Sequence, residues 1–310
     1  MTQQQPSNRE LSFAAGVFTV FLCVIFGSNA VAVKIAFSGL GVFTTASIRF
    51  AIAAVAIFSW ARLTGRTIAL KKGQLHQVII FSTLFTIQLS FFYLGLSKSN
   101  ASRGTLLANL VPFFILFLAH FFIPGDRITK RKFFGILLGF TGVVFMFLEK
   151  KGLADGYRTG DLLILMAVVI WAASTIYLKR IIDTYSPFQV VLYSTLFSVP
   201  FFFLEALLWD PVMVTRLDVP VIGSLLYQSL VSASFGFVAW NTLLQKYGAV
   251  SLHAFLFIMP IAGVVLGGVV LGEPITLKIL LALVFIVIGI LVVHGKSRKE
   301  ESVYPIRRSI

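Results

Sequence analysis

The sequence predicts an all-α integral membrane protein with ten transmembrane helices in two inverted-topology five-helix repeats. Apolar residues make up 58% of the 310 residues and charged residues only 12%, which is roughly half the charged share of a soluble domain. The apolar residues fall in runs of about 20, the length that crosses a bilayer, and the two halves of the chain share a common order of motifs. This composition argues against a soluble enzyme, and the single cysteine, Cys23, argues against a disulfide scaffold.

Ten windows of suitable length and hydropathy follow one another along the chain. The predicted spans are 11–33, 42–62, 76–97, 103–123, 132–149, 160–180, 187–208, 219–244, 249–271 and 276–294. The first apolar run is longer than that of a signal peptide, so we expect it to remain in the protein. The resulting units are an N-terminal tail (1–10), a first five-helix repeat (11–149), a connecting loop (150–159), a second repeat (160–294) and a basic tail (295–310).

The basic residues indicate the orientation of these spans. With the N-terminus inside, 17 Lys and Arg fall in inner segments and 8 in outer ones, and basic residues favour the cytoplasmic side. We therefore expect a protein of the cell inner (plasma) membrane with both termini in the cytoplasm. Because the bases are scattered in short clusters, the net charge of +14 does not indicate nucleic acid as a partner. The expected partners are the lipid bilayer and a small-molecule substrate, and monomer and homodimer both stay open.

The two predicted units resemble each other in sequence. Residues 26–34 (FGSNAVAVK) align with residues 171–179 (WAASTIYLK) at an offset of 145, and later motifs align at 147 to 148. Since five spans is an odd number, the second unit enters the membrane from the opposite side, which makes the repeats inverted. Inverted repeats can exchange conformations, so this arrangement predicts alternating access around a site near the bilayer midplane.

Several short motifs recur in a fixed order along the chain. They are FGSN with a later Lys in the first span, Arg49-Phe50 in the second, Pro112 followed by Gly125-Asp126, Gly160-Asp161-Leu162-Leu163 with Trp171, and Pro260 followed by Leu271-Gly272-Glu273-Pro274. Together, over residues 12–294, they resemble the EamA family of the drug/metabolite transporter superfamily. The resemblance implies a secondary transporter, usually an exporter of amino acids or other small metabolites, with a cavity lined mainly by spans 1, 3, 4, 6, 8 and 9. Phe26 and Asp126 stand where the family commonly has Trp and Glu, which leaves the substrate class open.

Polar side chains and prolines within spans are the candidate cavity residues, because placing polar groups in a membrane is costly unless they have a use. Asn109 and Pro112 share one helical stripe of span 103–123, and His253, Phe257 and Pro260 form the equivalent stripe of span 249–271. A proline frees a backbone carbonyl as an acceptor, although structural kinks explain the two prolines equally well.

Other candidates lie in the remaining spans that the resemblance assigns to the cavity. They are Asn29, Gln88, Tyr93, Trp171, Ser174 and Asn241. Asn29 aligns with Ser174, and Tyr93 with Asn241. We favour the cavity for Asn29 and Trp171 and interhelical hydrogen bonding for Ser174, while aromatic residues near helix ends are often interfacial anchors.

Charged residues are expected only at the rim of the cavity. Lys34 and Arg49 can extend their stems to the outer surface, and pairing with Glu149 or Glu273 is at least as consistent as binding an anionic ligand. No Asp or Glu is expected at mid-depth, which argues against a proton antiporter built on a deep glutamate. His253 is therefore the best titratable candidate for proton coupling.

The predicted function is export of a small amphipathic metabolite, such as an amino acid or a related compound, by alternating access. Motifs for ATP hydrolysis, zinc or nucleophilic catalysis are absent from the sequence, so we expect no catalytic residues, no cofactor and no metal. A nucleotide-sugar-type exchanger or importer is an alternative, although it would need more bases than Lys34 and Arg49. A membrane-embedded enzyme or lipid-handling scaffold is an alternative of another class, which convergent acidic or His side chains would favour.

Overall fold

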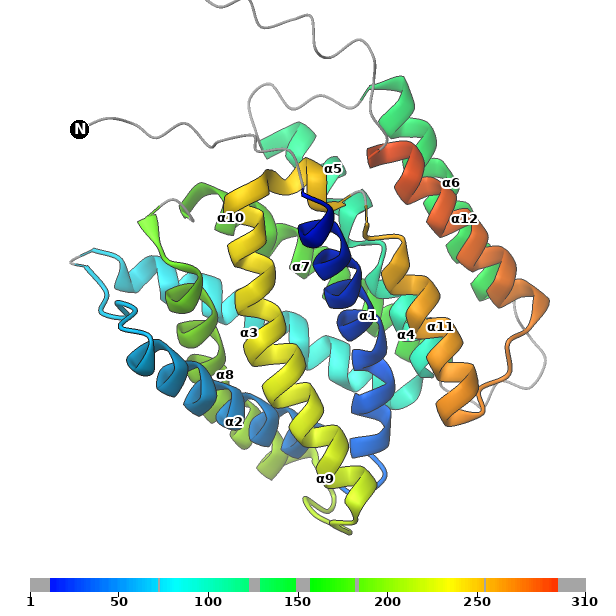
Figure 1. The fold of residues 1–310 in the computed structure, drawn as a ribbon. Helices are drawn as coiled ribbons and strands as arrows, with labels where there is room; N and C mark the ends of the chain where they lie inside the picture. Colours follow the sequence, from blue (N-terminus) through cyan, green and yellow to red (C-terminus); the bar gives the residue numbers. More distant parts are fainter. Residues whose placement is uncertain are drawn as a thin grey trace, which may run out of the picture.

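The computed structural model describes residues 12–71, 73–122, 129–148, 157–181, 184–253 and 255–294. These ranges form a bundle of helices with no β-strand among them (Figure 1). In chain order the elements are α1 (Phe13–Ala36), α2 (Val42–Leu63), α3 (Leu75–Lys98), α4 (Ala101–Ala108), α5 (Val111–Phe122), α6 (Lys130–Phe147), α7 (Tyr157–Ile181), α8 (Pro187–Trp209), α9 (Val219–Leu226), the π-helical stretch η2 (Tyr227–Gly236), α10 (Phe237–His253), α11 (Ile258–Leu271) and α12 (Leu277–His294).

Seven described helical stretches are long and apolar enough to cross a membrane. They are Phe13–Ala36, Val42–Leu63, Leu75–Lys98, Ala101–Phe122, Tyr157–Leu178, Pro187–Trp209 and Val219–Leu243. Large apolar side chains cover the outside of the bundle, as expected for helices that face lipid: Phe13 is 88% exposed and Val55 67%. The predicted all-α membrane protein is confirmed. Both expected tails and most of the connecting loop at 150–159 lie outside the described residues.

The span predicted at 103–123 is divided into α4 and α5 by a turn at Asn109 and Leu110. Pro112 has no N–H to donate to the carbonyl of Ala108, which weakens the helix at this point, although α8 continues through Pro200. The Asn109 Nδ2 donates to the Thr105 carbonyl at 2.8 Å, which also accepts from the Asn109 N–H at 3.1 Å. The helix therefore breaks where the sequence predicts only a kink.

The spans predicted at 219–244 and 249–271 are also divided differently. α9, η2 and α10 follow one another without interruption from Val219 to His253, and the turn lies at residues 255–257. Pro260 is the third residue of α11, where an N–H would have no partner within the helix. In η2, the Ser234 hydroxyl donates to the Ser229 carbonyl five residues earlier, at 2.7 Å.

Helices from the first half of the sequence pack against helices from the second half. α1 packs on α11, α2 on α8, α3 on α7, and α6 on α12 (Figure 1). Glycine permits the closest crossings. A Cβ atom added at Gly27 of α1 would lie 2.5 Å from the Met259 carbonyl oxygen and 2.8 Å from the Ala262 Cβ, both in α11. Gly263 and Gly267 of α11 pack against Thr105 and Ser102 of α4 in the same way. The Gly-x-x-x-Gly spacing in α11 thus serves packing within the chain.

One end of the bundle holds three carboxylates that each bridge distant segments, and we call it the acidic end (Asp161, Asp210 and Glu273). Asp210 accepts from the Thr44 N–H at 2.7 Å and so caps the start of α2. Glu273 accepts from the N–H groups of Ala101 at 2.6 Å and Ser102 at 2.8 Å, which caps α4. Both carboxylates also benefit from the positive dipole of a helix N-terminus.

Neutral groups make the corresponding bonds at the opposite end, which we call the amide end (Gln74 and Gln189). Gln74 Nε2 donates to the Thr184 carbonyl at 2.7 Å, and Gln189 Nε2 donates to the Ala69 carbonyl at 2.7 Å. These bonds tie the segment between α2 and α3 to the segment around the start of α8. Both ends of the bundle are therefore closed by bonds between residues far apart in the sequence.

Candidate functional site

A chain of buried hydrogen bonds joins α2, α3 and η2 in the interior, and we call its three residues the Arg49 cluster (Arg49, Tyr93 and Gln228). Arg49 Nη1 donates to the Tyr93 hydroxyl at 2.8 Å. That hydroxyl donates in turn to Gln228 Oε1 at 3.4 Å. Arg49 is 2% exposed, and Tyr93 and Gln228 are both fully buried. The structure thus places a cation inside the bundle.

Arg49 has no acidic partner among the residues that the structure describes. Among the described residues, Arg103 forms an ion pair with Asp161 and Arg216 forms one with Asp218. The guanidinium instead lies 5.0 Å from the Phe50 ring centroid, beside a cluster that includes Tyr93 and Phe202. A buried charge without a counter-ion costs several kcal/mol, so this charge is a feature that needs an explanation.

Several other polar atoms in the interior have no hydrogen-bond partner among the described groups. They are Asn29 Oδ1, Arg49 Nε, Ser82 Oγ, Gln88 Oε1, Thr105 Oγ1, Gln228 Nε2 and Ser232 Oγ. Native proteins pair the large majority of buried polar side-chain atoms with protein or ordered water. Two of these atoms belong to the Arg49 cluster itself, and Ser232 lies one helical turn from Gln228 on η2. The interior around η2 is therefore rich in unused hydrogen-bonding capacity.

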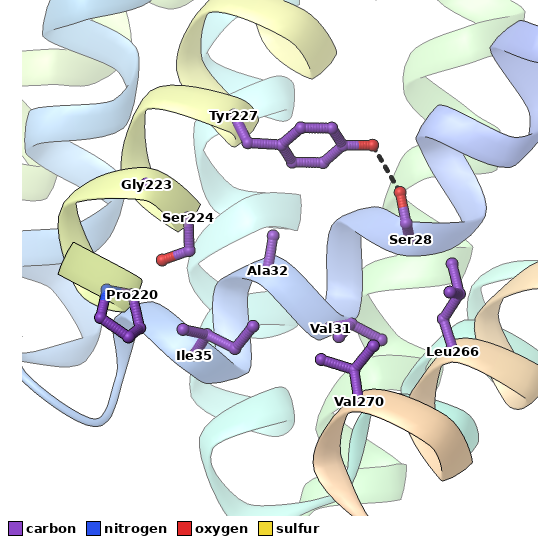
Figure 2. A pocket seen from close by; sticks show the side chains of 10 residues that line it. All are labelled: Ser28, Val31, Ala32, Ile35, Pro220, Gly223, Ser224, Tyr227, Leu266 and Val270. Carbon is purple, nitrogen blue, oxygen red and sulfur yellow. Dashed lines mark hydrogen bonds between the residues drawn. The ribbon is translucent and has the colours of Figure 1, made fainter.

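A groove of about 360 Å³ lies between α1, α9, η2 and α11 (Figure 2), and we call it the α1–α11 groove. Its lining is Ser28, Val31, Ala32, Ile35, Pro220, Gly223, Ser224, Tyr227, Leu266 and Val270. Figure 2 shows the side chains of Ser28 and Tyr227 joined by a hydrogen bond across its wall. Tyr227 directly precedes Gln228 in η2. The groove lining and the Arg49 cluster thus include consecutive residues of η2.

The predicted cavity residues occupy varied positions. Gln88 and Ser174 are buried, and Asn29, Pro112 and Phe257 are partly buried. Asn109 and Pro260 are buried beside the two helix breaks, and Asn241 donates to the Phe237 carbonyl at 2.8 Å. Among those whose side chains the structure describes, Tyr93 alone is hydrogen-bonded to another predicted site residue, Arg49. The side chain of His253 lies outside the described part of the structure.

Two of the predictions need correction. Arg49 does not extend to the surface, because its guanidinium is bound by Tyr93 inside the bundle. Lys34 does not form an ion pair at the rim: its Nζ donates to the carbonyls of Leu96 at 3.2 Å and Ser99 at 2.8 Å, where the C-terminal end of α3 attracts a cation. Glu149, the other expected partner, lies outside the described residues. Trp171 is 43% exposed and does not line the α1–α11 groove, and its place in the cavity stays a prediction.

The sequence patterns do not single out Gln228 and Tyr227 as site residues, or the ion pair between Arg103 and Asp161. Arg103 Nε donates to Asp161 Oδ2 at 2.9 Å, and the Ser99 hydroxyl donates to Asp161 Oδ1 at 2.7 Å. Asn100 is the sequence feature that could have indicated the burial of Arg103. It caps α4 by accepting a hydrogen bond from the Arg103 N–H at 2.8 Å. An N-cap at that residue places Arg103 inside the helix rather than in a loop.

Acidic and metal-binding side chains do not converge in the interior that the structure describes. No group of three or more His, Cys, Asp or Glu in those ranges is arranged to hold a metal ion. The groove is lined by apolar groups and the hydroxyls of Ser28, Ser224 and Tyr227, whereas the Arg49 cluster contains a phenol, an amide and one guanidinium. This arrangement offers hydrogen bonds and one positive charge to a ligand.

The model of the EamA-like transporter family matches the chain twice, over residues 14–148 and 158–295. The chain belongs to the EamA-like transporter family. The two matches cover most of the residues on either side of the connecting segment at 149–157, so each half of this EamA-like transporter carries the family pattern by itself. The predicted family is confirmed, and the protein is a multi-pass membrane transporter by family.

Known relatives of this EamA-like transporter extend over almost the full chain. An uncharacterized transporter of Archaeoglobus fulgidus is 29% identical, with 86% of this chain and 93% of that protein covered. A probable amino-acid metabolite efflux pump of Escherichia coli is 26% identical, with 89% and 93% covered. A solved crystal structure that is 19% identical has a TM-score of 0.67 and covers 91% of this chain and 96% of its own. The last likeness concerns the fold alone.

Proposed function

We propose that this EamA-like transporter exports a small amphipathic metabolite, an amino acid or a related compound, across the cell inner membrane. The observation that carries the proposal is its similarity to the probable amino-acid metabolite efflux pumps of Escherichia coli and Salmonella typhimurium, each 26% identical over 89% of this chain. The predominantly apolar lining of the α1–α11 groove supports it, because apolar walls with the few hydroxyls of Ser28, Ser224 and Tyr227 suit an amphipathic ligand.

The architecture that we propose for transport has ten spans in two inverted repeats, over residues 11–149 and 160–294. Helix packing supports it. If α1 corresponds to α7 and α3 to α9 with η2, a two-fold axis exchanges the contact of α3 with α7 for the contact of η2 with α1. In the same way the packing of α5 on α7 is the counterpart of the packing of α11 on α1, and both contacts are present.

Alternating access would proceed by rocking of the two repeats around the interior that holds the Arg49 cluster. Opening the acidic end requires the bonds of Asp210 and Glu273 to break, because each joins the two repeats. Opening the other end requires release of Gln74 and Gln189. We place the amide end and both termini in the cytoplasm, in keeping with the basic residues.

Counterflow in proteoliposomes tests the proposed function directly. Vesicles containing the purified chain are loaded with one unlabelled compound, and uptake of the same labelled compound is measured. The panel comprises amino acids, related metabolites and one nucleotide sugar, with and without a pH gradient. We expect counterflow of at least one amphipathic amino acid or relative. Binding of lipid without movement of any solute would contradict transport, and movement of the nucleotide sugar alone would favour the exchanger.

A further inference from the structure

We propose that the Arg49 cluster is a carboxylate-binding subsite for a monocarboxylate ligand whose apolar part occupies the α1–α11 groove. The transport of this ligand rests on the proposed function, whereas its binding can be measured separately. Three features of the structure support the subsite: the missing counter-ion, the unused donors, and the adjoining groove.

The missing counter-ion is evident from a comparison of the arginines in this chain. Arg103 is as deeply buried as Arg49, yet it is paired with Asp161 and also donates to the Met146 carbonyl at 3.1 Å. Even the exposed Arg216 lies 3.1 Å from Asp218. Arg49 has only a neutral phenol and an aromatic face. Because a bound anion would offset the cost of this buried charge, the geometry favours a ligand with a negative group.

The unused polar atoms of the Arg49 cluster are donors. Tyr93 occupies Nη1 of Arg49 and Oε1 of Gln228, which leaves Arg49 Nε and Gln228 Nε2 without acceptors. A carboxylate presents two oxygens with about four acceptor positions, so one such group has enough acceptor positions for both donors. A single guanidinium matches one negative charge, and charge-assisted bonds of this kind are the stronger ones.

The adjoining groove gives the ligand its second part. Its volume of about 360 Å³ is near the lower end for small-molecule sites, which start at ~300 Å³. Val31, Ile35 and Leu266 offer apolar contacts to a hydrocarbon or aromatic group (Figure 2). The Ser28 and Tyr227 side chains are hydrogen-bonded to each other at the wall of the groove, and Tyr227 directly precedes Gln228 in η2.

Binding of matched ligands to the purified full chain tests the subsite. The probes are 3-phenylpropanoate and its neutral isostere 3-phenylpropanamide, with dissociation constants measured by calorimetry. Because the bond to a charged group is lost with the amide, we expect the carboxylate to bind roughly tenfold to a hundredfold more tightly. Arg49→Gln should abolish this preference. The matched control Arg216→Gln, which alters an exposed arginine outside the site, should keep it.

A conservative variant keeps the test decisive if Arg49→Gln fails to fold. Arg49→Lys retains the charge but not the planar donor group, so its preference for the carboxylate should fall below that of the wild type. A purely structural role for Arg49 predicts a lower melting temperature in either variant with an unchanged preference, which would overturn the proposal. An equal stabilising effect of chloride and 3-phenylpropanoate would also overturn it, because the site would then accept any anion.

Binding and counterflow together separate this proposal from the proposed function. Arg49-dependent binding of the carboxylate without counterflow of any solute would support the subsite and contradict transport. Counterflow of solutes with equal binding of the acid and the amide would leave transport intact and overturn the subsite. The absence of binding for both probes would likewise overturn a monocarboxylate subsite.

Discussion

Two buried arginines have opposite environments in this protein. Arg103 is enclosed by Asp161 and the Met146 carbonyl, whereas Arg49 lies against Phe50 and Tyr93 without an acid among the described residues. Both residues lie close to predicted span ends, where a long side chain normally reaches the membrane surface. Their burial therefore depends on the neighbouring helices, and it divides them into a structural pair and a candidate ligand-binding cation.

Asp161→Asn should strongly destabilise the protein. It leaves the charge of the fully buried Arg103 unpaired, which typically costs about 3–5 kcal/mol. The expected result is a clear drop in melting temperature in detergent, measured by thermal unfolding. Asp218→Asn is the matched control: its partner Arg216 is 58% exposed, and exposed pairs contribute about 0–1 kcal/mol. Equal effects of the two substitutions would contradict this assignment.

Asn109→Ala should slow transport without reducing membrane insertion. Asn109 supplies the side-chain bond to the Thr105 carbonyl at the break between α4 and α5, and this break adjoins the interior. Counterflow rates and the membrane-inserted fraction are the two measurements. Thr83→Ala removes a comparable bond, to the Ile79 carbonyl, from an exposed position of α3 and serves as the control. A wild-type rate for Asn109→Ala would show that the break does not take part in transport.

The helices owe their irregularities to a few residues and their tight packing to glycine. Pro112 lies just after the turn between α4 and α5, and Pro260 lies just after the turn between α10 and α11. The predicted spans 103–123 and 249–271 therefore each contain a turn. In the π-helical stretch η2, Tyr227 lines the groove, whereas the next residue, Gln228, is hydrogen-bonded to Tyr93. Irregular helical turns of this kind are frequent at functional sites.

Gly27→Ala should disturb the crossing of α1 and α11. The new methyl group would lie 2.5 Å from the Met259 carbonyl oxygen and 2.8 Å from the Ala262 Cβ, so one helix has to move. Overpacking of this kind typically costs about 1–3 kcal/mol, which thermal unfolding will detect. Gly223→Ala is the control for the stability measurement. No neighbouring atom lies within 4 Å of its new Cβ, so no overpacking is expected there. A Gly27→Ala protein as stable as the wild type would argue against this close crossing.

At the scale of the whole molecule, bonds between distant segments close both ends of the bundle. Carboxylates form them at the acidic end, and amides form them at the amide end. The two ends thus differ in charge as well as in position. This difference makes the orientation of the protein in the membrane accessible to experiment.

Cysteine labelling in intact cells should distinguish the two ends. The natural Cys23 is buried, so the wild-type chain provides a low background. Arg66→Cys lies in the exposed segment after α2, and Arg216→Cys lies in the exposed segment before α9. We expect a membrane-impermeant maleimide added outside to label Arg216→Cys and to leave Arg66→Cys unlabelled until the membrane is opened. Equal labelling of both from outside would overturn the proposed orientation.

The sequence was sufficient for the features that depend on local composition. The ends of α2, α3 and α8 agree closely with the predicted spans, because apolar length and flanking polar residues determine where a helix can cross a bilayer. The family follows from short motifs whose order is visible in the chain. The candidate site was less accessible: Tyr93 and Arg49 are apparent as individual residues, but nothing in their spacing relates them to Gln228, 135 positions beyond Tyr93.

The sequence by itself thus determined a helical membrane protein of the EamA-like transporter family. Only the tertiary structure decided which polar groups lose contact with water, because burial depends on packing between α2, α3 and η2 rather than on hydropathy along one helix. It paired Arg103 with Asp161 and left Arg49 with a phenol. The physical reason is that the partner of a buried charge lies on another helix, at a distance in sequence that local patterns do not encode.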